Sequence, residues 1–419
     1  MFGFNQRITF SANIPRRRVD ISKRKALGLA LACLASFALC PDIQAATRLG
    51  RLIEKFKPQI TQVKKLFKIK KKGLLEGPTL KTSTIRHAIV IGLDGRIEKE
   101  GTGAKSETEV QNLFRNSVSR FIEKGGNSLL LHLHGANHSR NKALKLAQEY
   151  ESPHLSRGTY PITIAWQTDI RSTLAGLWKR MRAQEKALQA KGISLPSVPQ
   201  SSKDRWIRKL GGKTFWDELK RKAKKTLKKD HALWLIRDEL RALKKKHPQM
   251  KLQLIATSAG TVMARHILQS FFFPEDQGDT LGFDLVQWKA GAEAIAEISP
   301  LLKHGFENGL IQRSIFWTLK KENEDQDRVA KVIKGSIIQL VSRALEKEMD
   351  IPLSGLERSL NEDTQIQDWI QNKRVLHLTS PNEFPKEDPR AARSVIHKDF
   401  ERDPVMFESE AQWIAKPSF

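Results

Sequence analysis

From residue 86 onward, short apolar runs alternate with amphipathic stretches of helical period, and this alternation leaves very few architectures open to the chain. The apolar runs that we expect to form strands are 87–91, 128–133, 162–166, 252–256, 283–288, 315–319 and 375–378. Between them, apolar residues spaced three and four apart at 233–243 are typical of a helix that buries one face. The alternation predicts an α/β fold, with a mostly parallel sheet of about seven or eight strands flanked by helices.

One long stretch, between Thr168 and Asp230, does not fit the alternation because it is basic and rich in helix formers. Insertions between strands of such sheets often cover the active site. We therefore expect a basic helical insertion, acting as a lid, at about residues 170–230. Its aromatic residues Trp206, Phe215 and Trp216 are expected to serve as lid or membrane contacts.

Positive charge is concentrated in a few segments of the chain. The net charge is +27, and segments 1–45, 51–81 and 203–246 carry +5, +8 and +11 of it, which leaves the rest of the protein close to neutral. Basic segments of this kind are attracted to anionic surfaces. They make an anionic membrane surface a possible partner, although a solvated tether explains residues 48–81 equally well.

The N-terminus has the order of a secretory signal peptide. Basic side chains at 16–18 and 23–25 precede an apolar stretch at 26–39, and Ile43-Gln44-Ala45 follows as a cleavage site. The apolar stretch is short for a membrane-spanning helix. We expect an exported protein, periplasmic or secreted, with an uncleaved membrane anchor as the alternative.

Both cysteines, Cys33 and Cys40, lie in this apolar stretch, so a cleaved protein has no thiol for disulfides, zinc or nucleophilic catalysis. The expected organisation is a signal peptide at 1–45, a basic linker at 46–84, and a catalytic domain at 85–419 that includes the insertion.

The clearest chemical signal is a serine between a predicted strand and a predicted helix. Ser258 follows the apolar run 252–256 and is flanked by Ala256 and Gly260 at minus two and plus two. This is the pattern of a nucleophile elbow, with Ala in place of the first Gly. Small residues are needed there because the sharp turn brings the strand and the helix very close together. Ser258 is therefore the candidate nucleophile, with an ordinary helix-capping serine as the alternative.

A serine nucleophile also needs N–H donors for the oxyanion of the tetrahedral intermediate. The backbone N–H of Ala259 follows the serine directly, and the loop after the run 128–133 supplies Ala136 as the second donor. His132, His134 and His138 lie in or near this loop and also suggest a metal site. However, their spacing does not match a binuclear metal pattern, so we expect no metal and no cofactor.

The general base is expected to be a histidine after the last strand, and His397 has that position. His377 is the competitor, but it lies within the predicted strand 375–378. The orienting acid should follow the strand 315–319, where several acids stand together. Asp327 is the first choice because Arg328-Val329 is expected to open the next helix, and Asp325 and Glu324 are the alternatives.

The order Ser258, Asp327, His397 resembles that of the α/β-hydrolase superfamily, and the similarity extends over residues 85–419. The closest resemblance is to poorly characterised bacterial serine-hydrolase-like proteins. It rests on His134-Gly135-Ala136-Asn137, on Asp327-Arg328, and on His397 with Phe400 three residues later. In this sequence Thr257 replaces the usual His before the serine, and Ala136 replaces an aromatic residue. The resemblance implies the α/β-hydrolase fold and a Ser-His-Asp triad that needs no cofactor.

Two main functions follow from these observations. The first is an exported serine hydrolase, esterase-like or lipase-like, that cleaves small-molecule or lipid esters. The alternative is a non-catalytic protein of the same fold that binds anionic membrane surfaces through its basic segments. A third interpretation, nucleic-acid binding through residues 203–246, agrees poorly with export, and we do not expect a nucleic-acid partner.

Overall fold

A parallel sheet of seven strands forms the centre of the structure, a computed structural model that describes residues 87–98, 106–136, 138–166, 170–192, 198–329 and 333–416. These residues belong to one compact unit, Thr79–Phe419. The strands are β1 (Ala88–Ile91), β2 (Ser128–Leu133), β3 (Thr159–Trp166), β4 (Lys251–Thr257), β5 (Phe283–Lys289), β6 (Ile311–Leu319) and β9 (Val375–Ser380). They lie in the order β1-β3-β2-β4-β5-β6-β9, and each neighbouring pair is parallel. Each apolar run predicted as a strand overlaps one of them.

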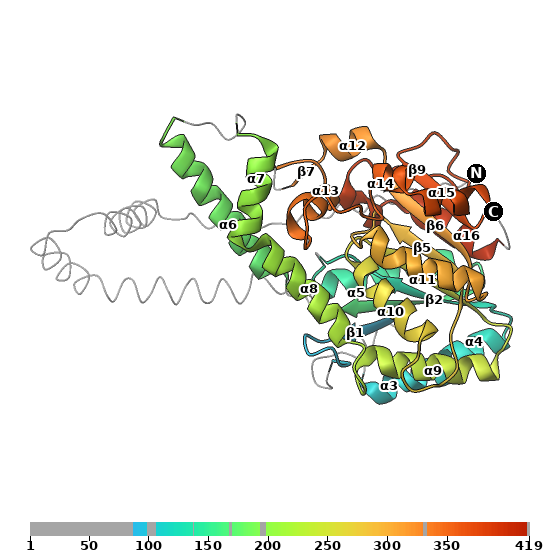
Figure 1. The fold of residues 1–419 in the computed structure, drawn as a ribbon. Coiled ribbons are helices and arrows are strands. Elements are labelled where there is room, and N and C mark those ends of the chain that lie inside the picture. Colours follow the sequence, from blue (N-terminus) through green and yellow to red (C-terminus); the bar gives the residue numbers. More distant parts are fainter. Residues whose placement is uncertain are drawn as a thin grey trace, which may run out of the picture. The chain divides into compact units, whose positions relative to one another are not determined.

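Helices connect the strands, as the alternation predicts (Figure 1). Before β4 they are α3 (Glu107–Asn112), η2 (Leu113–Val118), α4 (Ser119–Glu123), α5 (Arg140–Leu155), α6 (Ile170–Gln189), α7 (Gln200–Ile207), η4 (Arg208–Gly212), α8 (Lys213–Lys225) and α9 (Ala232–Lys246). After β4 they are α10 (Gly260–Phe272), α11 (Ile295–Glu307), α12 (Lys321–Gln326), α13 (Ile337–Leu340), η5 (Val341–Leu345), α14 (Glu357–Glu362), α15 (Thr364–Gln371), η6 (His397–Glu401) and α16 (Pro404–Ala415).

Both faces of the sheet are covered. In β2, Leu129 and Leu131 belong to a core that includes side chains of α9, α10 and α11, whereas Leu130 belongs to a core with side chains of α5 and α16. Successive side chains of a strand point to opposite faces, so an unbroken run of buried leucines requires a hydrophobic layer on each side. The predicted α/β class, with helices on both sides of a parallel sheet, is confirmed.

The segment that was expected to form a lid contains α6, α7 and α8. Figure 1 shows α6 and α7 projecting away from the strands. Helix α8 is different, because Phe215, Trp216 and Leu219 are buried in the core shared with α10. The Trp216 indole N–H donates to Glu346 at 2.7 Å. The expectation that Phe215 and Trp216 contact a membrane is therefore wrong, because both side chains face inward.

The chain after α12 also differs from the prediction. Arg328-Val329 was expected to open a helix, but these residues form a short strand, β7 (Arg328–Val329), antiparallel to β8 (Ile333–Lys334). Helix α12 ends because Asp327 has an extended backbone (φ −60°, ψ 160°), and its carbonyl accepts the Gly335 N–H across the hairpin. The prediction was wrong because the pairing with β8 outweighs the local helical preference.

The predicted signal peptide at 1–45 and the basic linker at 46–84, with both cysteines, lie outside the described residues. Within the described part of the chain, no helix is long and apolar enough to cross a membrane.

Candidate active site

Ser258 occupies the sharp turn between β4 and α10. Its φ of +52° is unfavourable for a residue with a side chain, by about 1 kcal/mol. Hydrogen bonds on both sides hold this conformation. The Ser258 N–H donates to the Lys289 carbonyl on β5 at 2.8 Å, and the Ser258 carbonyl accepts the Thr261 N–H at 3.0 Å. The turn therefore projects the serine hydroxyl beyond the end of the sheet, at the N-terminus of α10.

The small residue at Gly260 is a steric requirement. A Cβ atom added there would lie 2.5 Å from the Leu133 carbonyl oxygen and 2.8 Å from that of His134. Both atoms belong to the backbone at the end of β2, so no side-chain movement relieves the contact. The sequence argument for small flanking residues is thus reproduced by the packing of α10 on β2.

His397 is brought to the serine by η6. Its Nε2 atom lies 2.9 Å from Ser258 Oγ. Burial lowers the pKa of His397 to about 4, although the nearby Asp327 carboxylate acts in the opposite direction. The ring is therefore neutral at pH 7 and able to accept a proton. His377, the competing histidine, lies on β9 and bonds Thr318 Oγ1 at 2.9 Å.

The three candidate acids have different surroundings. Among the described residues, Asp327 is the acid that bonds to His397. Its Oδ2 atom accepts the backbone N–H of His397 at 3.0 Å. The imidazole Nδ1 is buried without a hydrogen-bond partner among the described residues. Asp325 instead forms an ion pair with Lys321 and accepts a hydrogen bond from Gln339 at 2.8 Å.

Glu324 has a different partner from Asp327. It is buried and bonded to the hydroxyl of Ser336. Burial raises the pKa of Glu324 to about 8, so this carboxyl group is mostly protonated at neutral pH. A neutral carboxyl group does not stabilise an imidazolium, and Asp327 therefore has the most suitable geometry and charge of the three.

The loop after β2 reaches the serine, as the predicted oxyanion site requires. A Cβ atom on Gly135 would lie 3.1 Å from Ser258 Cβ, so Ala136 follows a residue in contact with the nucleophile. The Trp166 indole donates to the His134 carbonyl at 3.1 Å and fixes the start of this loop. Ala259 begins the turn into α10, and its N–H donates to no group in the described part of the chain. Asn137 lies outside the described residues.

One residue near the site was not identified from the sequence. The Glu401 carboxylate, at the end of η6, accepts the Gly135 N–H at 2.6 Å and pairs with His138 Nε2 at 3.1 Å. The available signal was its place four residues after His397, which puts both residues on one short helical element.

The three histidines around this loop have separate environments. His132 stacks on Tyr150, with 4.0 Å between ring centroids, whereas His138 pairs with Glu401. Burial lowers the pKa of His134 to about 3. Among the described residues, no group of three or more His, Cys, Asp or Glu side chains is arranged to hold a metal ion.

A buried charged network lies on the sheet face that α5 and α16 cover. Lys289, whose carbonyl accepts the Ser258 N–H, forms an ion pair with Glu410 of α16, and neither side chain is exposed. The Tyr150 hydroxyl of α5 donates to Glu410 at 2.7 Å and accepts from the Lys289 ammonium at 3.1 Å. Burial raises the pKa of Glu410 and of Tyr150. The network joins β5, α5 and α16.

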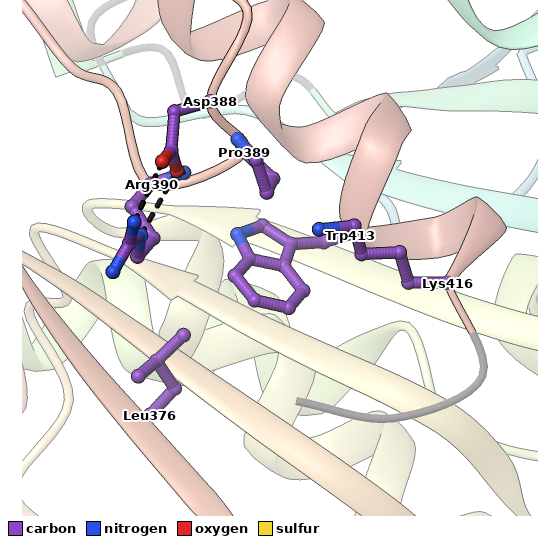
Figure 2. A pocket seen from close by; sticks show the side chains of 6 residues that line it. All are labelled: Leu376, Asp388, Pro389, Arg390, Trp413 and Lys416. Atoms are coloured by element: carbon purple, nitrogen blue, oxygen red, sulfur yellow. Dashed lines mark hydrogen bonds and ion pairs between the residues drawn. The ribbon is translucent and has the colours of Figure 1, made fainter. Parts of the chain in front are cut away.

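A hollow of about 350 Å³ lies on another part of the surface. Figure 2 shows the side chains that line it. It is lined by Leu376, Asp388, Pro389, Arg390, Trp413 and Lys416. Leu376 is near the start of β9, whereas Ser258 follows the end of β4. Because the strands are parallel, the hollow lies near the N-terminal ends of the strands, whereas Ser258 lies at their C-terminal ends. Arg390 is already paired with Asp388 at 2.7 Å.

Comparison with known proteins adds no family assignment: neither a protein-family model nor a curated protein matches the chain. The functional argument therefore rests on the geometry of the site.

Proposed function

We propose that the protein is a serine hydrolase of the α/β-hydrolase fold that cleaves carboxylic esters, with Ser258 as nucleophile and His397 as general base. The observation that carries the proposal is the 2.9 Å contact between His397 Nε2 and Ser258 Oγ, made by a serine held at φ +52° between β4 and α10. These two residues are 139 positions apart in the chain. A strained serine beside a neutral histidine is the arrangement that activates a hydroxyl group.

In the proposed reaction, Ser258 Oγ attacks the ester carbonyl carbon while His397 Nε2 takes the hydroxyl proton. The tetrahedral intermediate collapses, the alcohol leaves with that proton, and an acyl-serine remains. Water, deprotonated by the same histidine, then releases the carboxylic acid and restores the hydroxyl group. Each step is balanced without a cofactor.

Asp327 is the proposed orienting acid. Its carboxylate already holds the backbone N–H of His397 and raises the pKa of the ring against the effect of burial. The proposal requires Nδ1–H to bond the same carboxylate when the imidazolium forms, which is consistent with catalytic hydrogen bonds that tighten in the substrate complex. Asp325 and Glu324 are bonded elsewhere.

The backbone N–H groups of Ala259 and Ala136 are the proposed oxyanion donors. Ala259 lies at the positive end of α10, which favours negative charge at that point. Ala136 follows Gly135, which contacts the nucleophile. Two such donors are expected for acyl transfer by a serine.

Labelling with a fluorophosphonate probe tests the proposal. The full chain should react covalently, and both Ser258→Ala and His397→Ala should lose the label. Two matched controls are available: Ser270→Ala removes another hydroxyl of α10, which donates to the Ile267 carbonyl, and His377→Ala removes the histidine of β9. Both controls should label as the wild type does. A folded wild type that does not react would contradict the enzymatic function.

Export is proposed from the N-terminal sequence. Mass measurement of the protein recovered outside the cytoplasm should show cleavage after Ala45. A full-length mass in the membrane fraction would instead support the uncleaved anchor.

A second candidate function is the binding of anionic membrane surfaces. The cations Lys224, Lys228 and Lys229, at the end of α8 and in the turn after it, are exposed, while the apolar side of α8 faces the core. Binding to vesicles rich in anionic lipid should weaken steeply with salt. If vesicles of any composition fail to bind the protein at low salt, this function is excluded.

A further inference from the structure

Glu401 connects two parts of the candidate site that are distant in sequence. It is the last residue of η6, and His397 is the first. Its Oε1 atom accepts the Gly135 N–H at 2.6 Å, and its Oε2 atom lies 3.1 Å from His138 Nε2. The side chains of Glu401 and His138 are 13% and 14% exposed, so both contacts are largely shielded from water.

Gly135 lies between Glu401 and the serine. A Cβ atom at Gly135 would be 3.1 Å from Ser258 Cβ and 3.2 Å from Glu401 Oε1. A larger residue would displace either the nucleophile or the carboxylate. The peptide that joins His134 to Gly135 is therefore fixed in direction by the hydrogen bond that its N–H donates to Glu401.

We infer that Glu401 is a positioning residue for the proposed hydrolysis: through its hydrogen bond with the Gly135 N–H it holds the loop that carries the proposed oxyanion donor, Ala136. The inference rests on the proposed function. Glu401 acts through the backbone of the loop and does not touch the reacting atoms. Because Glu401 and His397 lie on the same element, η6, this hydrogen bond also fixes the position of the loop relative to His397.

The role depends on a hydrogen-bond acceptor and not on negative charge. A carboxylate close to a developing oxyanion repels it, and this effect opposes catalysis. A glutamine at 401 keeps an acceptor oxygen for the Gly135 N–H and removes the charge. Glu401→Gln should therefore retain activity within about threefold, whereas Glu401→Ala should lose about tenfold or more in kcat.

The experiment compares these two variants with a matched control, Glu408→Ala. Glu408 lies on α16, a few residues beyond η6, and its carboxylate forms a partly exposed ion pair with Arg157 at 2.7 Å. We would measure kcat and KM for a p-nitrophenyl ester, the affinity for a trifluoromethyl ketone, and the melting temperature. The ketone forms an oxyanion adduct with an active serine and so reports on the oxyanion site.

The expected result for Glu401→Ala is a lower kcat, a KM within about twofold of the wild type, and an affinity for the ketone reduced by the same factor as kcat/KM. Its melting temperature should differ from that of Glu408→Ala by only a few degrees. If the role of Glu401 were purely structural, the substitution would lower the melting temperature without reducing the affinity for the ketone.

Wild-type kcat and ketone affinity in a folded Glu401→Ala would overturn the inference while leaving the proposed function intact. If this variant does not fold, Glu401→Asp decides: it withdraws the carboxylate by one methylene group, and undiminished kcat would overturn the inference. A wild type that neither labels with fluorophosphonate nor binds the ketone removes the proposed function, and the inference is rejected with it.

Discussion

The nucleophile turn, residues 256–260, and the acidic segment, residues 324–328 from the end of α12 to the start of β7, contribute to the same candidate site but are built differently. In the turn, backbone hydrogen bonds and close packing define the position of Ser258. In the acidic segment, three acids stand within four positions, and each has its own partners. The position of the proposed nucleophile is therefore determined by local steric requirements, whereas the choice of the proposed acid is determined by contacts with segments far along the chain.

The largest expected effect separates the acids of the acidic segment. Asp327→Asn should lower kcat/KM by about 10²–10⁴, because the amide no longer stabilises an imidazolium. Asp325→Asn is the matched control, since Asp325 is exposed and bonds Lys321 and Gln339. Steady-state ester hydrolysis measures both. Equal losses in the two variants would show that Asp327 has no special role among these acids.

The next effect tests the packing of the turn. Gly260→Ala should destabilise the protein by about 3 kcal/mol and slow fluorophosphonate labelling, because the new methyl group collides with the β2 backbone. Gly176→Ala in α6 is the control, because the nearest described atom to its added Cβ would be the flexible end of Arg180, at 3.7 Å. Denaturant unfolding measures the difference. If Gly260→Ala is as stable as Gly176→Ala, the close contact between α10 and β2 is not a constraint.

The smallest effect concerns Glu324 and has a defined pH dependence. Burial raises its pKa from the usual 4.5 to about 8, so the folded protein keeps a proton that the unfolded chain releases. Stability from this group is complete below pH 4.5 and is lost as the pH rises toward 8. Between about pH 6 and pH 7 the wild type should lose about 1.4 kcal/mol relative to Glu324→Gln.

Chemical denaturation at the two pH values measures this difference. The control is Glu322→Gln, an exposed carboxylate on the same helix. The control should show the same pH dependence as the wild type. If Glu324→Gln also does so, then Glu324 ionises normally in the folded protein.

The sequence predicted the features that depend on neighbouring residues. The consecutive leucines of β2 indicated a strand buried on both faces, and the small residues around Ser258 indicated the turn. The position of His397 after the last strand was also predictable, and the structure places its Nε2 atom 2.9 Å from Ser258 Oγ.

Features that depend on distant segments were not predictable. Phe215 and Trp216 lie in a basic segment whose composition predicts an exposed surface. In the structure they are covered by residues from elsewhere in the chain. Glu401 gains its partners from the loop after β2, more than two hundred positions away. The pairing of Arg328-Val329 with β8 likewise replaced the helix that the local sequence suggested.

The two contacts of Lys289 affect how the protein unfolds in heat or denaturant. Its carbonyl holds the backbone of Ser258, and its ammonium lies in a dry ion pair with Glu410 on the last helix. Separation of the helix would break this ion pair at the same residue whose carbonyl holds Ser258. We therefore expect detachment of α16 and distortion of the nucleophile turn to occur together, so that reactivity of Ser258 and packing of the C-terminal helix are lost in one transition.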